Sequence, residues 1–155
     1  MPQPAKQNKQ LQPLIGVWSV AMVPPGQERP AELPDIGARM TFEWVGDKAF
    51  VVQRWSVPVP EAPDGLAVIG WDAGRATFLQ HYFDDRGVAR VYEMSFDGRL
   101  WKLERSKPDF SPYEFAQRYT GALTADGQRI EGTWELAPDK KTWEKDFDLI
   151  YTRVA

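Results

Sequence analysis

Short Asp-Gly turns recur in this chain between runs of alternating apolar and polar residues. Asp97-Gly98 and Asp126-Gly127 each separate two such runs, and this dipeptide is the strongest short signal for a β-hairpin. No apolar repeat with the 3.6-residue helical period continues for a useful length. The pattern therefore predicts about ten antiparallel strands, over residues 14–22, 39–45, 49–57, 66–71, 77–83, 88–96, 99–105, 115–123, 128–136 and 143–152.

Sequential antiparallel strands leave exposed edges unless the first strand pairs with the last. We therefore predict an all-β fold, a ten-stranded up-and-down barrel that forms one domain over residues 14–155. The polar segment 1–13 holds three prolines and is compatible with a short helix around 5–12 or with a disordered start. A barrel of more than eight strands has room for a ligand.

The turns also predict which side chains face inward. Counting from Asp126-Gly127 as a two-residue turn places Tyr119 opposite Trp134 and, on the other face, Arg118 opposite Glu135. The same count at Asp97-Gly98 predicts an inner face formed by Tyr92, Met94, Phe96, Trp101 and Leu103. A turn at 138–141 would pair Leu136 with Trp143 and Ile130 with Leu149. The outer face of that hairpin then carries a solvated acidic set, Glu131, Glu135, Glu144, Asp146 and Asp148.

Composition excludes several classes of function. The net charge is −3, from 19 basic and 22 acidic residues, so the chain lacks the basic field of a nucleic-acid-binding domain. No cysteine is present, which excludes disulfides and thiolate metal sites, and no metal site of any kind is predicted. The polar start has no signal core, and no run approaches the ~20 apolar residues of a membrane span, so we expect a cytoplasmic protein without a membrane partner.

His81 is the only histidine, and its orientation depends on the length of one loop. A four-residue loop over 84–87 places His81 opposite Arg90 inside the barrel, where Arg105 completes a cationic cluster near one mouth. Buried cations are costly without partners, so such a cluster implies an anionic ligand or an internal acid. A three-residue loop over 85–87 reverses the parity, so that Tyr82 and Gln80 point inward and His81 points outward. The sequence leaves both alternatives open.

Large rings are abundant, with seven Trp, eight Phe and five Tyr. A set of rings expected inside the barrel either lines a cavity for a flat apolar ligand or fills the interior. The glycines Gly70, Gly121 and Gly132 favour a cavity, because they leave space among the rings. We expect the connections 23–37 and 107–112 to gate its mouth. The ring set is Trp55, Tyr92, Trp101, Tyr119, Trp134 and Trp143.

The motif Leu14-Ile15-Gly16-Val17-Trp18 resembles the L-x-G-x-W start of lipocalin-like and nitrobindin-like (calycin) barrels. The runs at 81–94, 126–134 and 143–151 resemble a group of bacterial lipocalin-like proteins without an assigned function, and this likeness covers nearly the whole chain. The resemblance implies a barrel that Trp18 plugs at one end. Nitrobindin-like proteins bind haem through a histidine near the C-terminus, but the last strand here has none, so only His81 remains for that role.

The leading hypothesis is non-catalytic binding of a small hydrophobic molecule, with an acidic group read by Arg90 and Arg105. A second hypothesis is an enzyme of secondary metabolism, a cyclase or isomerase, in which Tyr82, Tyr92 or His81 acts as general acid. The third is haem binding through His81; otherwise no cofactor is expected. Apolar side chains left outside around 66–83 predict a homodimer patch. The predicted ligand-binding residues are Trp55, His81, Tyr82, Arg90, Tyr92, Trp101, Arg105, Tyr119 and Trp134.

Overall fold

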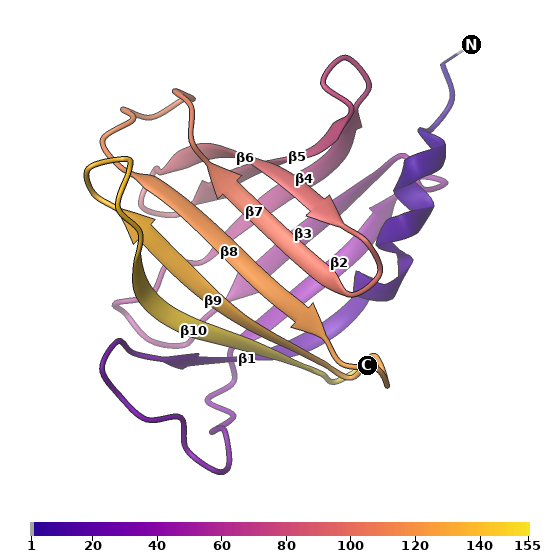
Figure 1. The fold of residues 1–155 in the computed structure, drawn as a ribbon. Helices are drawn as coiled ribbons and strands as arrows, with labels where there is room; N and C mark the ends of the chain where they lie inside the picture. The colour runs from indigo at the N-terminus through magenta and orange to yellow at the C-terminus, as the bar shows by residue number, and fades with distance from the viewer. Residues whose placement is uncertain (1) are drawn as a thin grey trace.

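The computed structural model describes residues 2–155, which form one closed antiparallel barrel (Figure 1). Ten strands follow one another around the barrel in chain order, and β1 pairs with β10 to close it. The all-β, ten-stranded barrel predicted from the sequence is confirmed. The elements are η1 (Lys6–Leu14), β1 (Gly16–Val23), β2 (Arg39–Val45), β3 (Phe50–Ser56), β4 (Gly65–Asp72), β5 (Thr77–Asp84), β6 (Ala89–Phe96), β7 (Leu100–Arg105), β8 (Ala116–Leu123), β9 (Arg129–Ala137) and β10 (Glu144–Arg153).

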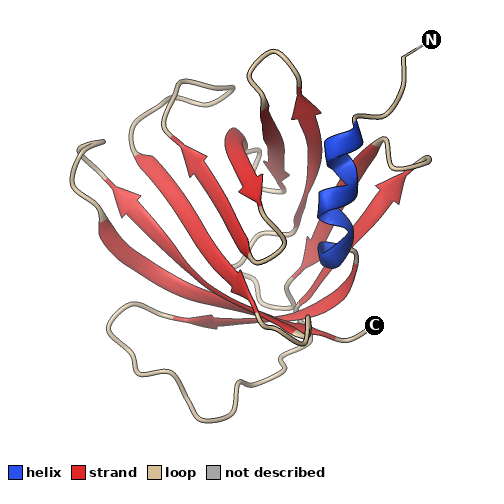
Figure 2. Cartoon of the chain, turned by 45° about the vertical axis from the view of Figure 1, so that its right-hand side comes forward, coloured by secondary structure: helices blue, strands red, loops and turns tan. Residues whose placement is uncertain are grey.

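The helical segment η1 packs against one end of the barrel, which we call the closed end (Figure 2). Leu11 and Leu14 of η1 are buried in the core. Asn8 fixes the helix to the β2–β3 turn, because its Nδ2 donates to the carbonyl oxygens of Lys48 and Ala49, each at 2.9 Å. The helix therefore covers apolar side chains that would otherwise meet water at this end.

Trp18 is fully buried beside η1 and plugs the closed end, as the resemblance implied. Its Nε1 donates to the carbonyl of Leu14 at 3.0 Å, and the Arg153 guanidinium lies 4.2 Å from the centre of its ring. A Cβ on Gly16 would lie 2.6 Å from Nη1 of Arg153, so a glycine is needed where the chain enters β1. The plug thus depends on both ends of the chain.

Two of the three predicted hairpins keep their predicted inner faces over their whole length, although one register differs. Tyr119 pairs with Trp134 and Arg118 with Glu135, as predicted. At the β6–β7 turn, however, Phe96 pairs with Trp101 instead of Arg99, so that four residues rather than two lie between the last paired residues. The Asp97 carboxylate accepts the backbone N–H groups of residues 99 and 100 and closes this wider turn. A change of two residues preserves the side-chain parity, so the predicted inner set is buried.

The last hairpin departs further from its prediction. Ile130 pairs with Tyr151 instead of Leu149, a shift of two residues. One residue comes from the turn, since Leu136 pairs with Glu144 instead of Trp143, and the other from a β-bulge between Lys145 and Phe147. The shift of two keeps Leu149 and Tyr151 on the inner face. Trp143 precedes β10, which begins at Glu144. The guanidinium of Arg118, a residue of the outer wall, lies 4.0 Å from the centre of its ring. Trp143 therefore does not belong to the interior ring set.

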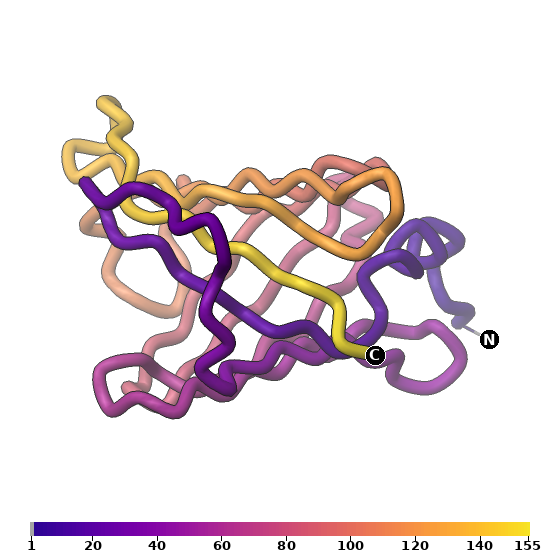
Figure 3. The backbone as a smooth tube through the Cα atoms, turned by 90° about the horizontal axis from the view of Figure 1, so that it is seen from below, coloured from indigo at the N-terminus to yellow at the C-terminus, as the bar shows by residue number. Residues whose placement is uncertain are grey.

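The connection between β1 and β2 does not follow the predicted gating arrangement. Arg29 donates to Glu131 on the outer face of β9, with a distance of 2.8 Å, so this connection lies along the outer wall (Figure 3). Glu131 belongs to the predicted acidic set, and Glu135 and Asp148 of that set also pair with cations, Arg118 and Lys145.

Candidate functional site

The candidate site lies at the open end of the barrel, opposite η1, where the chain turns between β3 and β4, β5 and β6, β7 and β8, and β9 and β10 (Figure 1). Four rings predicted from the sequence meet inside this end. Trp55 stacks on Tyr82 with ring centres 5.1 Å apart, and Tyr82 meets Tyr92 edge to face at 6.1 Å. Tyr92 in turn meets Trp134 at 5.6 Å. We call these four side chains the open-end rings.

The β5–β6 loop has three residues, which resolves the two alternatives for His81. The Asp84 backbone N–H donates to the carbonyl of Val88, and Gly87 adopts a left-handed φ of 81°. Tyr82 and Gln80 consequently face inward, and His81 lies on the outer wall, with its ring centre 6.3 Å from that of Phe110. The structure thus has the second alternative, because one loop residue fewer reverses the face of every side chain on β5. His81, although included among the predicted ligand-binding residues, does not face the interior.

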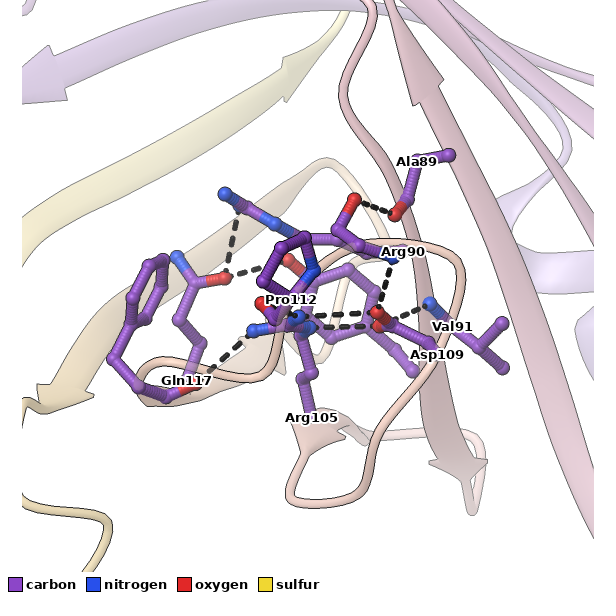
Figure 4. A network of polar contacts seen from close by, with 10 residues as sticks. Ala89, Arg90, Val91, Arg105, Asp109, Pro112 and Gln117 are labelled. Atoms are coloured by element: carbon purple, nitrogen blue, oxygen red, sulfur yellow. Dashed lines mark hydrogen bonds and ion pairs between the residues drawn. The ribbon is translucent and has the colours of Figure 1, made fainter.

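Arg105 faces inward and is buried, but its charge is matched by an internal acid (Figure 4). Its Nε and Nη2 donate to the two oxygens of Asp109 at 2.7 and 3.0 Å. Its remaining hydrogen bonds go to the carbonyls of Phe115 and Pro112. Arg105 therefore holds the β7–β8 loop in place, and its guanidinium is already occupied by protein groups.

Asp109 also closes a gap in the barrel wall. β7 pairs with β6 only from Glu93 onward, and the Val91 N–H donates instead to Asp109 at 3.0 Å. Burial raises the pKa of Asp109, but hydrogen bonds from Arg105 and from the backbone of Val91 and Ser111 outweigh it and hold the pKa below its usual value. The carboxylate thus replaces the missing strand pairing at this edge.

Arg90 differs from Arg105 in having no acidic partner within residues 2–155. Its Nη1 donates to Gln117 Oε1 at 3.1 Å, and Tyr92 donates to the same oxygen at 2.9 Å. Its Nε is buried and has no hydrogen-bond partner in this part of the chain. Arg90 pairs across the sheet with Tyr82 and stacks on Phe115, so its positive charge lies among the rings of the open end.

Trp101 and Tyr119 lie deeper than the open-end rings and are fully buried. Their ring centres are 5.1 Å apart, and Tyr119 occupies the space beside Gly121 and Gly132. A Cβ on Gly132 would lie 2.0 Å from the Tyr119 hydroxyl oxygen. These two glycines therefore make room for a ring instead of a cavity. Gly70 lies on the outer face of β4, where it receives the exposed ring of Phe50, so it leaves no space inside the barrel.

A buried amide pair below the open-end rings was not predicted from the sequence. Gln80 Nε2 donates to Gln53 Oε1 at 2.7 Å, and each residue is only 3% exposed. Gln53 lies between Val51 and Trp55 in the inward-facing positions of β3. The alternation of side chains along this strand therefore indicated, from the sequence, that a polar side chain would point into the barrel.

A separate cleft of about 280 Å³ lies at the closed end, beside the β6–β7 turn. Trp71, Phe78 and Met94 form part of its wall. None of the open-end rings contributes to it, so the cleft and the candidate site are distinct.

The tyrosines inside the barrel are kept protonated. Burial raises the pKa of Tyr82, and its hydrogen bond to Asp84 at 2.7 Å raises it further. Burial also raises the pKa values of Tyr92, Tyr119 and Tyr151. Such phenols are hydrogen-bond donors with little acidity near neutral pH, which weakens the support for Tyr82 or Tyr92 as general acids.

These shifts predict the alkaline titration of the protein, which has five tyrosines. At about pH 10, the ordinary midpoint, we expect the folded protein to show less than half the phenolate absorbance of the unfolded chain. Ultraviolet absorbance in buffer and in denaturant measures both values. Equal absorbance in the two states would contradict the raised pKa values.

A haem held by histidine does not fit the residues of the interior. His81 is the only histidine in the sequence, and it faces outward. Among residues 2–155, no three His, Asp or Glu side chains are grouped closely enough to hold a metal ion. In the same described range, no helix has the length and apolar character of a membrane span.

Known proteins support the fold. No family model and no curated protein matches the chain. Solved structures do match, among them the crystal structure of Rv2717c from M. tuberculosis, with a TM-score of 0.60 and 16% sequence identity. That match covers 99% of this chain and 100% of the other. At this identity the likeness shows a shared barrel architecture and nothing about ligand or reaction.

Proposed function

We propose that the protein binds a small, flat, apolar molecule with an acidic group at the open end of the barrel. The observation that carries this proposal is Arg90, an inward-facing cation without an acidic partner within residues 2–155. A guanidinium in partly buried surroundings is costly unless hydrogen bonds match its charge. A ligand carboxylate would provide that match, with its charge beside Nε and Nη of Arg90.

The open-end rings favour a flat apolar body for this ligand. Trp55, Tyr82 and Trp134 are each half-buried, so part of every ring remains open to contact. Aromatic rings bind planar molecules by stacking and by edge-to-face contacts. Arg105 supports the site indirectly by holding the β7–β8 loop beside Arg90, because its own donors are bound to Asp109 and to loop carbonyls. The homodimer patch predicted around residues 66–83 stays a separate prediction, and Phe83 in this range is exposed on the outer wall.

Substitution of Arg90 tests the proposal. Arg90→Gln keeps polar donors but removes the charge, so we expect it to weaken binding of α-naphthoic acid about tenfold or more, the loss typical of one charge-assisted hydrogen bond. Binding of the uncharged naphthalene methanol should change less than about twofold. Isothermal titration calorimetry measures both affinities.

Arg54→Gln is the matched control, since Arg54 is an exposed arginine on the outer face of β3. It should leave both affinities unchanged. If Arg90→Gln weakened the acid and the alcohol equally, the charge would have no part in recognition and the proposal would fail. Recovery of the acid unchanged after prolonged incubation separates binding from catalysis.

A further inference from the structure

The amide pair Gln53–Gln80 has hydrogen-bonding capacity that the protein does not use. Each side chain is 97% buried, and one hydrogen bond of 2.7 Å joins Gln80 Nε2 to Gln53 Oε1. Within residues 2–155, the opposite atoms, Gln53 Nε2 and Gln80 Oε1, have no hydrogen-bond partner. The pair therefore presents one free N–H₂ donor and one free carbonyl acceptor.

This conclusion does not depend on how the amide groups are turned. One hydrogen bond between two amides consumes one donor and one acceptor. If both amides were flipped, Gln53 would donate to Gln80, and a donor and an acceptor would again remain. Flipping one amide alone would set two donors or two acceptors against each other at 2.7 Å, so both orientations that keep the hydrogen bond leave the pair with this complementary capacity.

The pair lies directly next to the residues of the proposed site. Ala67 on β4 pairs with Gln53 on one side and with Tyr82 on the other. Gln80 pairs with Tyr92, and Tyr82 pairs with Arg90 on the same inner wall. The amides, the rings and the cation consequently occupy neighbouring positions on β3, β5 and β6.

We propose that Gln53 and Gln80 recognise an amide-like edge on the ligand, a ring carbonyl adjacent to a ring N–H. This inference rests on the proposed function and names the chemical class of its ligand: a planar heteroaromatic acid with a lactam edge. The acidic group faces Arg90, the ring contacts Tyr82, and the lactam C=O and N–H meet the free donor and acceptor of the pair. A hydrocarbon ring acid would leave both amides unmatched.

The amide pair is not needed for the stability of the fold, which is expected of side chains kept for binding. A buried polar pair can be replaced by apolar side chains of similar shape with little or no loss of stability, whereas removal of one partner leaves the other unsatisfied. Gln53→Met/Gln80→Met should therefore fold as stably as the wild type. Gln53→Met alone should lower the melting temperature, because it removes the acceptor of Gln80.

Three probes test the inference: 2-quinolone-4-carboxylic acid, which has the lactam and the acid, α-naphthoic acid, which has only the acid, and 2-quinolone, which has only the lactam. We expect the wild type to bind the quinolone acid at least about tenfold more tightly than the naphthoic acid, as a site built around hydrogen bonds prefers the group that satisfies them. In the double Met variant this preference should vanish, and the affinity for naphthoic acid should stay the same or increase. Arg90→Gln should weaken both acids and keep the lactam preference.

The outcomes distinguish this inference from the proposed function. Equal binding of the two acids by the wild type, or an unchanged lactam preference in the double Met variant, overturns the role of the amide pair while the acid-binding site stands. If the wild type bound 2-quinolone-4-carboxylic acid no more tightly than the uncharged 2-quinolone, the proposed function would be overturned. Failure of all three probes to bind overturns both.

Discussion

Asp109→Ala is expected to lower the free energy of unfolding by about 3–5 kcal/mol, the usual loss when one member of a buried ion pair is removed. The side chains of Arg105 and Asp109 are 1% and 2% exposed, so the remaining guanidinium would have no access to water. The Val91 and Ser111 N–H groups would lose their acceptor at the same time. Urea denaturation followed by tryptophan fluorescence measures the change.

The pair Arg118–Glu135 is the matched control, since it has the same two-pronged geometry on the outer wall. Its side chains are 37% and 29% exposed, so Glu135→Ala should cost less than about 1 kcal/mol. A loss of similar size for Asp109→Ala and Glu135→Ala would contradict the view that the buried pair holds the β7–β8 loop.

The same pair predicts how stability depends on pH. The pKa of Asp109 is lowered in the folded protein, so its contribution is fully present above the ordinary carboxyl pKa of about 3.9 and is lost as the pH falls toward the folded value. Asp109→Asn should therefore show a weaker loss of stability below about pH 4 than the wild type.

Gly132→Ala is expected to lower the free energy of unfolding by about 1–3 kcal/mol, the range for overpacking a filled core. The new Cβ would lie 2.0 Å from the Tyr119 hydroxyl oxygen and 2.3 Å from Cζ, and the ring is enclosed by Trp101 and Trp134. Thermal unfolding by circular dichroism measures the change. Gly74→Ala is the control, because its Cβ would meet only Asp72 Oδ1, at 3.3 Å.

A double substitution identifies the cause of that loss. Tyr119→Leu alone should destabilise the protein by leaving a cavity, but Gly132→Ala combined with Tyr119→Leu should cost less than the sum of the two. Strict additivity would show that the ring and the glycine do not interact, contrary to the packing of Tyr119 over Gly132.

The sequence alone could not predict that aromatic rings fill the space beside the interior glycines. It identified Gly121 and Gly132 as openings among the rings, yet whether an opening stays empty depends on which side chain enters it in three dimensions. Tyr119, on the same inner face, enters this one. In the same way, the sequence showed that Arg90 and Arg105 face inward but not that Asp109, four residues after Arg105, folds back onto it.

The alternation of apolar and polar residues and the turn residues between them determined the ten strands, their order and most of their inner faces, because side chains in a strand alternate with a fixed period of two. Only the tertiary structure decided features that depend on the exact number of residues in a loop or bulge, or on contacts between residues far apart in the sequence. The three-residue loop after Asp84 turned His81 outward, and the last register moved by one residue at the turn before β10 and by one more at the bulge before Phe147. Each of these is a difference of one residue in a local conformation, which period-two patterning cannot resolve.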